Sequence, residues 1–316
     1  MYLFTFKKKI MQITNNIFMV RPKHFSFNFE TAHNNFYQNQ VKISSKEIID
    51  NVIAEFDKMV DNLINKGINV DVFEDKDDLI TPDSIFPNNW ITMHESGEIV
   101  LYPMFAKNRK IEVREDIIKV LTKKYNFSNT IDLRKNICND IFLEGTGSMV
   151  FDRKKRILYA SISERTNQKL VEHFSKIFNY KTILFKSLQK VKNNYFPIYH
   201  TNVMMSIGED FCVICLDSII DSKQKKNVIL SLEESEKKII CISEKQKNNF
   251  AGNMLQLKGN DKTLIMSKSA FKSLERNQIK KLESLTEILV CEIDTIEKIG
   301  GGSVRCMIAE IFSNAS

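Results

Sequence analysis

Apolar and polar residues alternate in a form that recurs five times along the chain. Each recurrence begins with a small or polar cluster and continues into a short apolar run. In most cases it then passes through a turn into a second apolar run. The five segments read FPNNWITMHESGEIVLYPM, FLEGTGSMVFDRKKRILYASIS, PIYHTNVMMSIGEDFCVICLDSI, FAGNMLQLKGNDKTLIMSKSA and GGSVRCMIAEIF. The turns HESGE, DRKKR, IGED and KGND predict hairpins in the first four segments.

Helical periodicity fills the stretches between these segments. KEIIDNVIAEFDKMVDNLINKG carries apolar residues three and four positions apart and ends at Gly67, which predicts a helix followed by a glycine cap. REDIIKVLTKKYN, NQKLVEHFSKIFNY and FKSLERNQIKKLES repeat this pattern, and INVDVF, KTILF and EILVCEI read as strands after helices. The repeating unit is therefore strand, strand, helix, strand. The last strand is expected at GGGSVRCMIAEIF, residues 300–312, and NNIFMVRP near the start is expected to complete that unit.

One polar residue leads each apolar run, and these residues keep a nearly constant spacing. They are Asn89, Glu144, His200, Asn253 and Cys306, separated by 55, 56, 53 and 53 residues. Units of this size cannot each bury a core, but in a ring their inner strands share one. We therefore predict an α/β fold, a five-bladed α/β propeller of ββαβ repeats with pseudo-fivefold symmetry. Such a ring would bring the five leading residues to one axis.

Composition agrees with an ordinary soluble protein. The 316 residues are 43% apolar and 27% charged, and no apolar stretch approaches the roughly 18 residues that a membrane span needs. The six cysteines are scattered, which favours free thiols in a reducing cytoplasm. We expect residues 1–12 to be a dispensable extension, with Met11 as an alternative start, and residues 13–316 to form a single catalytic domain.

Metal, cofactor and nucleic-acid partners are not expected. Cys212-Val-Ile-Cys215 is the nearest approach to a metal motif, but no second Cys or His pair accompanies it. Its segment reads as a strand, and we place it in an outer strand. The net charge of +7 is spread as single and double lysines, which is typical of a solvated surface rather than of a nucleic-acid interface. Homo-oligomerisation stays open.

Three of the leading residues form a candidate catalytic set. A nucleophilic cysteine needs a base to form its thiolate and a third group to orient that base, and Cys306, His200 and Glu144 supply these types. Taken singly, a buried Cys or His is more often a core residue. The three residues share the same position in their repeats, and the other cysteines and histidines do not. This shared position favours a catalytic role for the three.

The order of these motifs resembles the guanidino-group modifying enzymes, the pentein superfamily of arginine deiminases, dimethylarginine hydrolases and amidinotransferases. The resemblance covers the chain from about Ile13 and implies a five-bladed α/β propeller. Five motifs of this chain taken together look most like the citrulline-utilisation hydrolases, or citrullinases: FPNNW, LEGTGSMVFD, YHTNVMM, AGNML and GGGSVRCM. The resemblance implies attack by Cys306 on the substrate carbon, proton transfers by His200 and orientation by Glu144, without a metal or organic cofactor.

Two departures from the arginine deiminases bear on the substrate. FPNN stands where deiminases carry Phe-Thr-Arg-Asp, and HTN stands where they carry His-x-Asp, so Asn89 and Asn202 replace carboxylates. A buried guanidinium without a counter-charge costs several kcal/mol. An asparagine, by contrast, can both donate to and accept from a neutral ureido group. The replacement favours citrulline.

The remaining candidates would bind the rest of the substrate. The predicted binding residues are Asn88, Asn89, Asn202, Asn253, Arg109 and Arg165. The two arginines are candidates for the substrate carboxylate, with a surface arginine as the alternative for each. SERT, which contains Arg165, resembles a stretch that supplies such an arginine in arginine deiminases. Arg305 should point away from the site, because neighbours on a strand face opposite sides.

The expected activity is hydrolysis of the citrulline ureido group to ornithine, CO2 and ammonia. One alternative is an arginine deiminase, amidinotransferase or dimethylarginine-type hydrolase acting on a guanidino substrate. The other is a non-catalytic binding protein on the same fold, as in the ribosome-binding translation initiation factor six.

Overall fold

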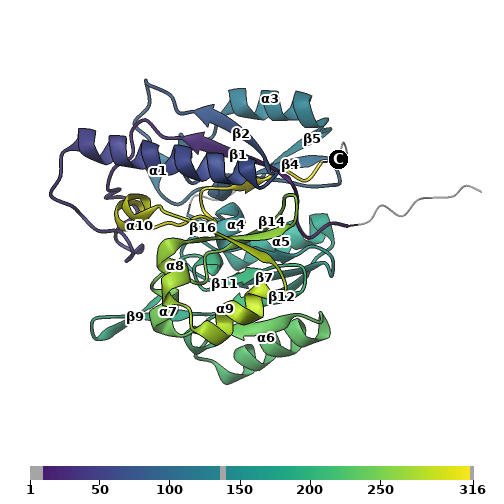
Figure 1. Ribbon diagram of the computed structural model, residues 1–316. Helices are drawn as coiled ribbons and strands as arrows, with labels where there is room; N and C mark the ends of the chain where they lie inside the picture. Colours follow the sequence, from purple (N-terminus) through teal and green to yellow (C-terminus); the bar gives the residue numbers. More distant parts are fainter. Residues whose placement is uncertain (1–9, 136–139, 314–316) are drawn as a thin grey trace, which may run out of the picture.

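A computed structural model describes residues 10–135 and 140–313 (Figure 1). Its strands are β1 (Asn16–Arg21), β2 (Asn69–Glu74), β3 (Ile91–Met93), β4 (Glu98–Leu101), β5 (Asn129–Asp132), β6 (Val150–Asp152), β7 (Ile157–Ser161), β8 (Lys181–Phe185), β9 (Leu188–Val191), β10 (Asn194–Pro197), β11 (Met205–Ile207), β12 (Phe211–Ile214), β13 (Lys238–Cys241), β14 (Leu255–Lys258), β15 (Lys262–Ser267), β16 (Glu287–Cys291) and β17 (Ala309–Glu310).

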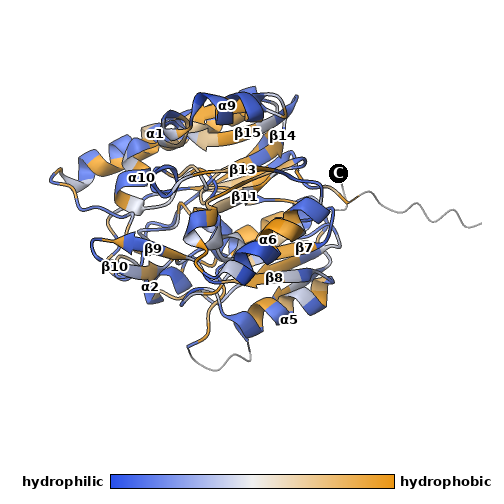
Figure 2. Cartoon of the chain, turned by 90° about the horizontal axis from the view of Figure 1, so that it is seen from below, coloured by the Kyte–Doolittle hydropathy of each residue, from blue (hydrophilic) through white to orange (hydrophobic). Residues whose placement is uncertain are grey.

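The helices lie between and around these strands. They are α1 (Ser45–Asn65), α2 (Lys107–Lys110), α3 (Glu115–Tyr125), α4 (Gly145–Ser148), α5 (Gln168–Phe178), α6 (Ser222–Glu234), α7 (Glu244–Lys247), α8 (Lys268–Ser273), α9 (Arg276–Glu283) and α10 (Asp294–Gly300), with 3-10 turns η1 (Pro87–Asn89), η2 (Thr201–Val203) and η3 (Leu216–Ser218). Figure 2 shows apolar residues concentrated on the strands and polar residues on the outward helix faces.

The predicted repeat is visible in the strand pairing. Five three-stranded sheets have the orders β17-β1-β2, β3-β4-β5, β6-β7-β8, β11-β12-β13 and β14-β15-β16, and β9 with β10 forms a separate hairpin. In every three-stranded sheet the inner pair is antiparallel and the outer pair is parallel. The expected completion of the last unit is confirmed, because β1 pairs with β17 through Ile17–Glu310 and Phe18–Ala309. Closure of the five sheets into one propeller ring stays a prediction.

Helix α1 shows why its sequence pattern predicted both the helix and its end. The Ser44 side chain accepts a hydrogen bond from the Glu47 amide and caps the first turn, and six apolar residues of one face are buried. Gly67 follows the helix with a φ of +79°, and a Cβ atom there would lie 2.3 Å from the Asn260 side-chain oxygen. Both the backbone angle and the close approach therefore require glycine.

Two expectations about elements were wrong. FKSLERNQIKKLES forms two helices, because Ser267 caps α8 and a capping box at Glu275 starts α9 after an extended Leu274. The strand expected within residues 300–312 is only β17, and the residues through Cys306 form turns. The glycines favour this outcome, since Gly301 caps α10 in a left-handed conformation that ends the helix sharply.

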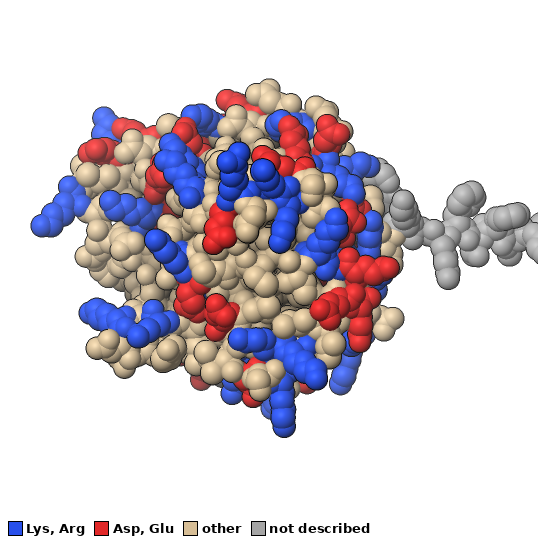
Figure 3. Space-filling model, turned by 60° about the horizontal axis from the view of Figure 1, so that its bottom comes forward, with Lys and Arg blue, Asp and Glu red and all other residues tan. Residues whose placement is uncertain are grey.

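The surface carries charges of both signs. Lysines and arginines are interspersed with acidic residues on the face shown in Figure 3. Within the described ranges, no helix combines the length and apolar character needed to cross a membrane.

A paired substitution tests the assignment of the buried face of α1. Leu63 is fully buried, whereas its neighbour Ile64 is 51% exposed. Leu63→Ala should lower the free energy of unfolding by about 2–5 kcal/mol, because it removes packed atoms and leaves a cavity. Ile64→Ala should change it by less than about 0.5 kcal/mol. Urea denaturation measures both, and equal losses would show that the helix packs through a different face.

Candidate active site

The five in-phase residues occupy equivalent places in the fold. Asn89 ends η1 before β3, Glu144 precedes α4 before β6, and His200 precedes η2 before β11. Asn253 follows a turn ahead of β14, and Cys306 lies in the turn ahead of β17. All five are buried, with exposures of 6% or less. Each unit thus presents one polar side chain at the start of its inner strand, which explains the constant spacing.

Glu144 and His200 form a direct buried pair. Nε2 of His200 lies 2.7 Å from Oε2 of Glu144, and Oε1 of Glu144 accepts a hydrogen bond of 2.9 Å from the Phe105 amide. Burial acts to raise the pKa of Glu144, but Arg165, whose Nη1 lies 3.6 Å away, and His200 lower it to about 2. Glu144 is therefore a carboxylate at neutral pH.

His200 is held neutral with a defined tautomer. Burial lowers its pKa to about 4 and outweighs the opposing effect of Glu144. A neutral imidazole has one N–H, and the carboxylate of Glu144 can only accept, so the proton lies on Nε2. Nδ1 is then free to receive a proton, as a catalytic base requires.

Cys306 is surrounded by amides. The side-chain nitrogens of Asn253 and Asn202 lie 3.3 and 3.6 Å from its sulfur. The Arg305 amide donates to Oδ1 of Asn253 at 3.1 Å, and this contact turns the NH2 group of Asn253 toward the sulfur. Two amide groups therefore lie within hydrogen-bond distance of the sulfur.

Asn89 approaches His200 from the first unit. Nη1 of Arg109 donates to Oδ1 of Asn89 at 2.6 Å, and because arginine only donates, the NH2 group of Asn89 must face the other way. That nitrogen has no partner within the described residues. A Cβ atom on Gly147 would lie 2.5 Å from it and 2.8 Å from Nδ1 of His200. The Asn89 amide and His200 therefore converge beside a position that only glycine can fill.

Two further amide oxygens in the site are buried without partners. Oδ1 of Asn88 and Oδ1 of Asn202 accept no hydrogen bond within residues 10–135 and 140–313. The nitrogen of Asn88 donates to the Thr146 hydroxyl at 3.2 Å, which leaves its oxygen facing elsewhere. Buried polar atoms without partners are rare and costly. One free donor and two free acceptors are what a polar ligand would satisfy.

Both candidate arginines are buried rather than on the surface. Arg109 is 2% exposed and is held by Glu112 through two hydrogen bonds of 2.9 Å. Arg165 is also 2% exposed; it hydrogen-bonds to Asn34 and stacks on Tyr199 with 4.8 Å to the ring centre. Nε of Arg165 has no partner among the described residues. Their role as carboxylate ligands stays a prediction.

Several residues of the site escaped the sequence reasoning. Asp83 is buried, its Oδ2 accepts from Asn28 at 2.8 Å, and its Oδ1 has no partner in the described chain. Burial raises the pKa of Asp83 in spite of the nearby Arg109. Glu112 is also buried, and the sequence reasoning did not place it near the site. The polar stretch TPDS ahead of FPNN was the available signal for Asp83, but it has no counterpart in the other units.

Arg305 is directed away from the thiol for a different reason than expected. It lies in a turn and not in a strand, so strand alternation does not decide its direction. Its guanidinium donates to the Ile308 carbonyl at 3.1 Å and to Glu310 at 2.7 Å. These contacts fix the turn that precedes β17.

The cysteines other than Cys306 lack such surroundings. Cys212 lies in β12, the central strand of its sheet and not an outer one, because β13 pairs on its far side. Burial raises the pKa of Cys212 and of Cys215, which disfavours thiolates. Cys138 lies outside the described residues. Within those residues, no three His, Cys, Asp or Glu side chains form a group that could hold a metal ion.

Comparison with solved structures identifies the fold. The N-terminal domain of ArgZ, an arginine dihydrolase from the ornithine–ammonia cycle in cyanobacteria, superposes with a TM-score of 0.72 at 19% identity, covering 94% of this chain and 98% of that one. AgrE in complex with ornithine and NAD+ gives 0.71 at 17% identity, covering 95% of this chain and 40% of AgrE. A dimethylarginine dimethylaminohydrolase adduct with S-methyl-L-thiocitrulline gives 0.63 at 14% identity, covering 94% and 99%.

These structures define a mixed α/β fold of the pentein type. Residues 21–313 match the eukaryotic N,N-dimethylarginine dimethylhydrolase family, and the chain belongs to this family. A search among curated proteins gives no match. The recognised superfamily is thus confirmed, whereas the citrullinase branch is not.

The lowered pKa of His200 predicts how stability depends on pH. An unfolded histidine titrates near 6.5 and the folded one near 4, so the unfolded chain binds more protons between these values. The free energy of unfolding should therefore fall as pH decreases from 6.5 to 4, by roughly 3 kcal/mol from this group. Denaturation of wild type and His200→Asn across this range measures the difference. Parallel pH dependences would contradict a buried neutral His200.

Proposed function

We propose that this protein is a cysteine-dependent hydrolase of the guanidino group of an arginine-type amino acid. The observation that carries the proposal is the buried Glu144–His200 pair at the same ends of the inner strands as an amide-lined Cys306. Membership of the dimethylarginine dimethylhydrolase family supports it. The proposal includes a closed five-bladed propeller over residues 13–316, a cytoplasmic location and a segment 1–12 that is dispensable apart from Gln12, whose buried side chain accepts from the Arg153 amide at 2.7 Å.

The chemistry proceeds in two halves. The sulfur of Cys306 attacks the guanidino carbon while the thiol proton passes to Nδ1 of His200. The carbon–nitrogen bond then breaks, and the leaving nitrogen takes that proton and departs as ammonia or an alkylamine. Water next gives a proton to His200 and attacks the covalent intermediate, and cleavage of the carbon–sulfur bond releases a ureido amino acid and restores Cys306. Glu144 stabilises the transient imidazolium.

The charges of the site favour a cationic substrate. Asp83, Glu112 and Glu144 lie beside the two guanidinium groups of Arg109 and Arg165, and burial raises the pKa of Asp83 and raises that of Glu112 to about 8. An arginine-type amino acid carries one net positive charge, which would favour the carboxylate forms of these two groups. The unpartnered Oδ1 of Asp83 offers such a substrate an acceptor. A bound cation would also offset the burial that raises the pKa of Asp83.

Citrulline is the second candidate substrate, and the Asn89 amide specifically favours it. The unpartnered NH2 group of Asn89 needs a hydrogen-bond acceptor. A guanidinium group has no acceptor, whereas a ureido group provides its oxygen. The free oxygens of Asn88 and Asn202 could then accept from the ureido nitrogens. Citrulline hydrolysis would give ornithine, CO2 and ammonia. If both hydrolyses occur in turn, the protein is an arginine dihydrolase, as ArgZ is described to be.

A substrate panel separates these possibilities. Release of ammonia, dimethylamine and ornithine should be measured with arginine, dimethylarginine and citrulline. Turnover of a guanidino compound supports the first proposal, and turnover of citrulline alone supports the second. Inertness toward every compound would favour a non-catalytic binding protein.

The nucleophile is tested by a pair of cysteine substitutions. Cys306→Ser should reduce turnover by much more than tenfold, because a hydroxyl is a far weaker nucleophile than a thiolate. Cys241→Ser is the matched control, since Cys241 is exposed and should be dispensable for turnover. Residual activity within about tenfold of wild type, or ~1.4 kcal/mol of barrier, would assign the chemistry to another residue.

The Asn89→Asp substitution tests how the site distinguishes a cation from a neutral group. An aspartate could still accept from Arg109, but its second oxygen would replace the free NH2 group. A guanidinium gains a charge-assisted hydrogen bond of about 1.5–3 kcal/mol, so the arginine-to-citrulline ratio of turnover should rise roughly tenfold to a hundredfold.

Binding of arginine gives the same comparison without turnover. The Asn89→Asp change is combined with Cys306→Ala, and arginine affinity is measured against Cys306→Ala alone. Adding Asn202→Asp should strengthen binding further. Unchanged arginine affinity in both carboxylate variants would mean that these amides do not face the reacting group.

A further inference from the structure

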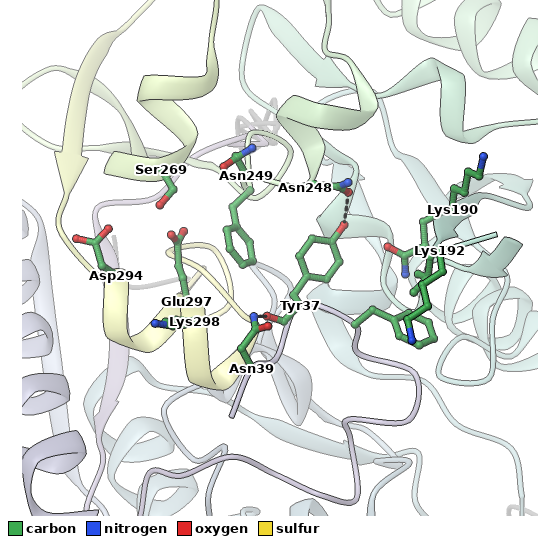
Figure 4. Close-up of a pocket in the computed structure, with 14 residues that line it drawn as sticks. Tyr37, Asn39, Lys190, Lys192, Asn248, Asn249, Ser269, Asp294, Glu297 and Lys298 are labelled. Carbon is green, nitrogen blue, oxygen red and sulfur yellow. Dashed lines mark hydrogen bonds between the residues drawn. The ribbon is translucent and has the colours of Figure 1, made fainter. Parts of the chain in front are cut away.

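A second cavity lies apart from the catalytic residues. It has a volume of about 490 Å³, and neither Cys306, His200 nor Glu144 lines it (Figure 4). Its walls come from the 22–44 segment, the β9–β10 hairpin, the turn after α7 and helix α10. The volume is ample for a small organic molecule. The mechanism uses none of these residues.

The cavity carries opposite charges on its two sides. Figure 4 shows Asp294 and Glu297 with Lys298 on one side, and Lys190 and Lys192 on the other, with Tyr37 between them. The first side therefore has two carboxyl groups against one ammonium group, and the second side has two ammonium groups. None of these charged side chains forms an ion pair within the described ranges, so the excess charge on each side is available to a ligand with its cation and anion at opposite ends.

Two buried side chains make this a built site rather than a shallow surface hollow. Glu297 is 4% exposed and still lines the cavity. Gln189 is also 4% exposed, lines the same cavity, and its amide nitrogen has no hydrogen-bond partner among the described residues. A buried amide donor left unpaired is costly unless a ligand satisfies it. Gln189 precedes Lys190 in β9, and because neighbours on a strand face opposite sides, its amide reaches the cavity from the other face of the strand than the lysine side chain.

The middle of the cavity is apolar. The Tyr37 and Phe250 rings pack 5.3 Å apart, centre to centre, and both line it. The Tyr37 hydroxyl is occupied by Asn248 at 3.4 Å (Figure 4), so the ring face rather than the hydroxyl is left for a ligand. A methylene chain between the charged ends would bury apolar surface here.

The cavity is connected to the nucleophile by a short chain of contacts. The Ser303 hydroxyl donates to Glu297 at 2.6 Å, and the Ser303 carbonyl accepts from the Cys306 amide at 2.9 Å. A ligand that binds the Glu297 carboxylate therefore changes the contacts of the turn that carries Cys306.

We propose that this cavity is an effector site for a small zwitterion whose ammonium and carboxylate groups are separated by a methylene chain. The ammonium lies at Asp294 and Glu297, and the carboxylate lies at Lys190 and Lys192. Occupancy alters the reactivity of Cys306 through Ser303.

Calorimetric titration of the full chain tests the site with 6-aminohexanoate as the probe. Hexanoate and hexylamine, which each keep one charge, are the matched controls. The zwitterion should bind about tenfold more tightly than either. Asp294→Asn and the Lys190→Gln, Lys192→Gln double variant should each weaken it about tenfold, whereas Lys223→Gln on α6 should not. Equal binding of the three compounds, or no binding of the zwitterion, would overturn the proposal.

Alkylation of Cys306 separates this site from the catalytic one. Binding of 6-aminohexanoate should persist after Cys306 has reacted with iodoacetamide, and its loss would place the probe in the catalytic site instead. The probe should also change the rate of that alkylation in wild type but not in Ser303→Ala, and an unchanged rate in wild type would refute the coupling. Neither readout requires turnover, so these results stand whether or not the proposed hydrolysis is correct.

Discussion

The hydrogen bond between Glu144 and His200 is the interaction on which the rest of the site depends. It joins the second and third repeats across 56 residues of sequence and is completely shielded from water. An ionised carboxylate in such a place must be compensated, and Arg165 provides the charge that keeps it ionised. Arg165 in turn is held by Thr31 and Asn34 of the 22–44 segment. A chain of polar contacts thus runs from the Glu144–His200 pair through Arg165 to this segment.

The repeat explains which parts of the molecule could be predicted. Glu144, His200 and Cys306 were identifiable because each unit places one polar residue before its inner strand, so their spacing follows from the architecture. Arg305 was misassigned to a strand because a glycine-rich stretch before apolar residues does not distinguish a turn from a strand start. Asp83 was missed because the position before η1 has no equivalent in the other units. A repeat reveals residues that occur in every unit, and Asp83 occurs in one unit only.

The identity of the substrate likewise depends both on residues that sequence reasoning could find and on residues that it could not. Asn89 and Asn202, read alone, indicate a neutral ligand, because they stand where related enzymes use carboxylates. The folded chain adds Asp83 and Glu112, two buried carboxyl groups beside Arg109 that sequence spacing could not place near the site. In the proposed enzyme, the amides would match a planar group, and these carboxyl groups would favour a cationic one.

The pairing of β1 with β17 gives the molecule a seam. Four of the five sheets draw all their strands from one continuous stretch of chain, whereas the fifth joins β1 and β2 from the start of the chain to β17 near its end. The turn that bears Cys306 leads directly into β17. A protease that severed the chain after β1 would leave the other four sheets with their strands intact, yet it would weaken the sheet that follows the Cys306 turn. The position of Cys306 therefore depends on a strand pairing that joins the two ends of the described chain.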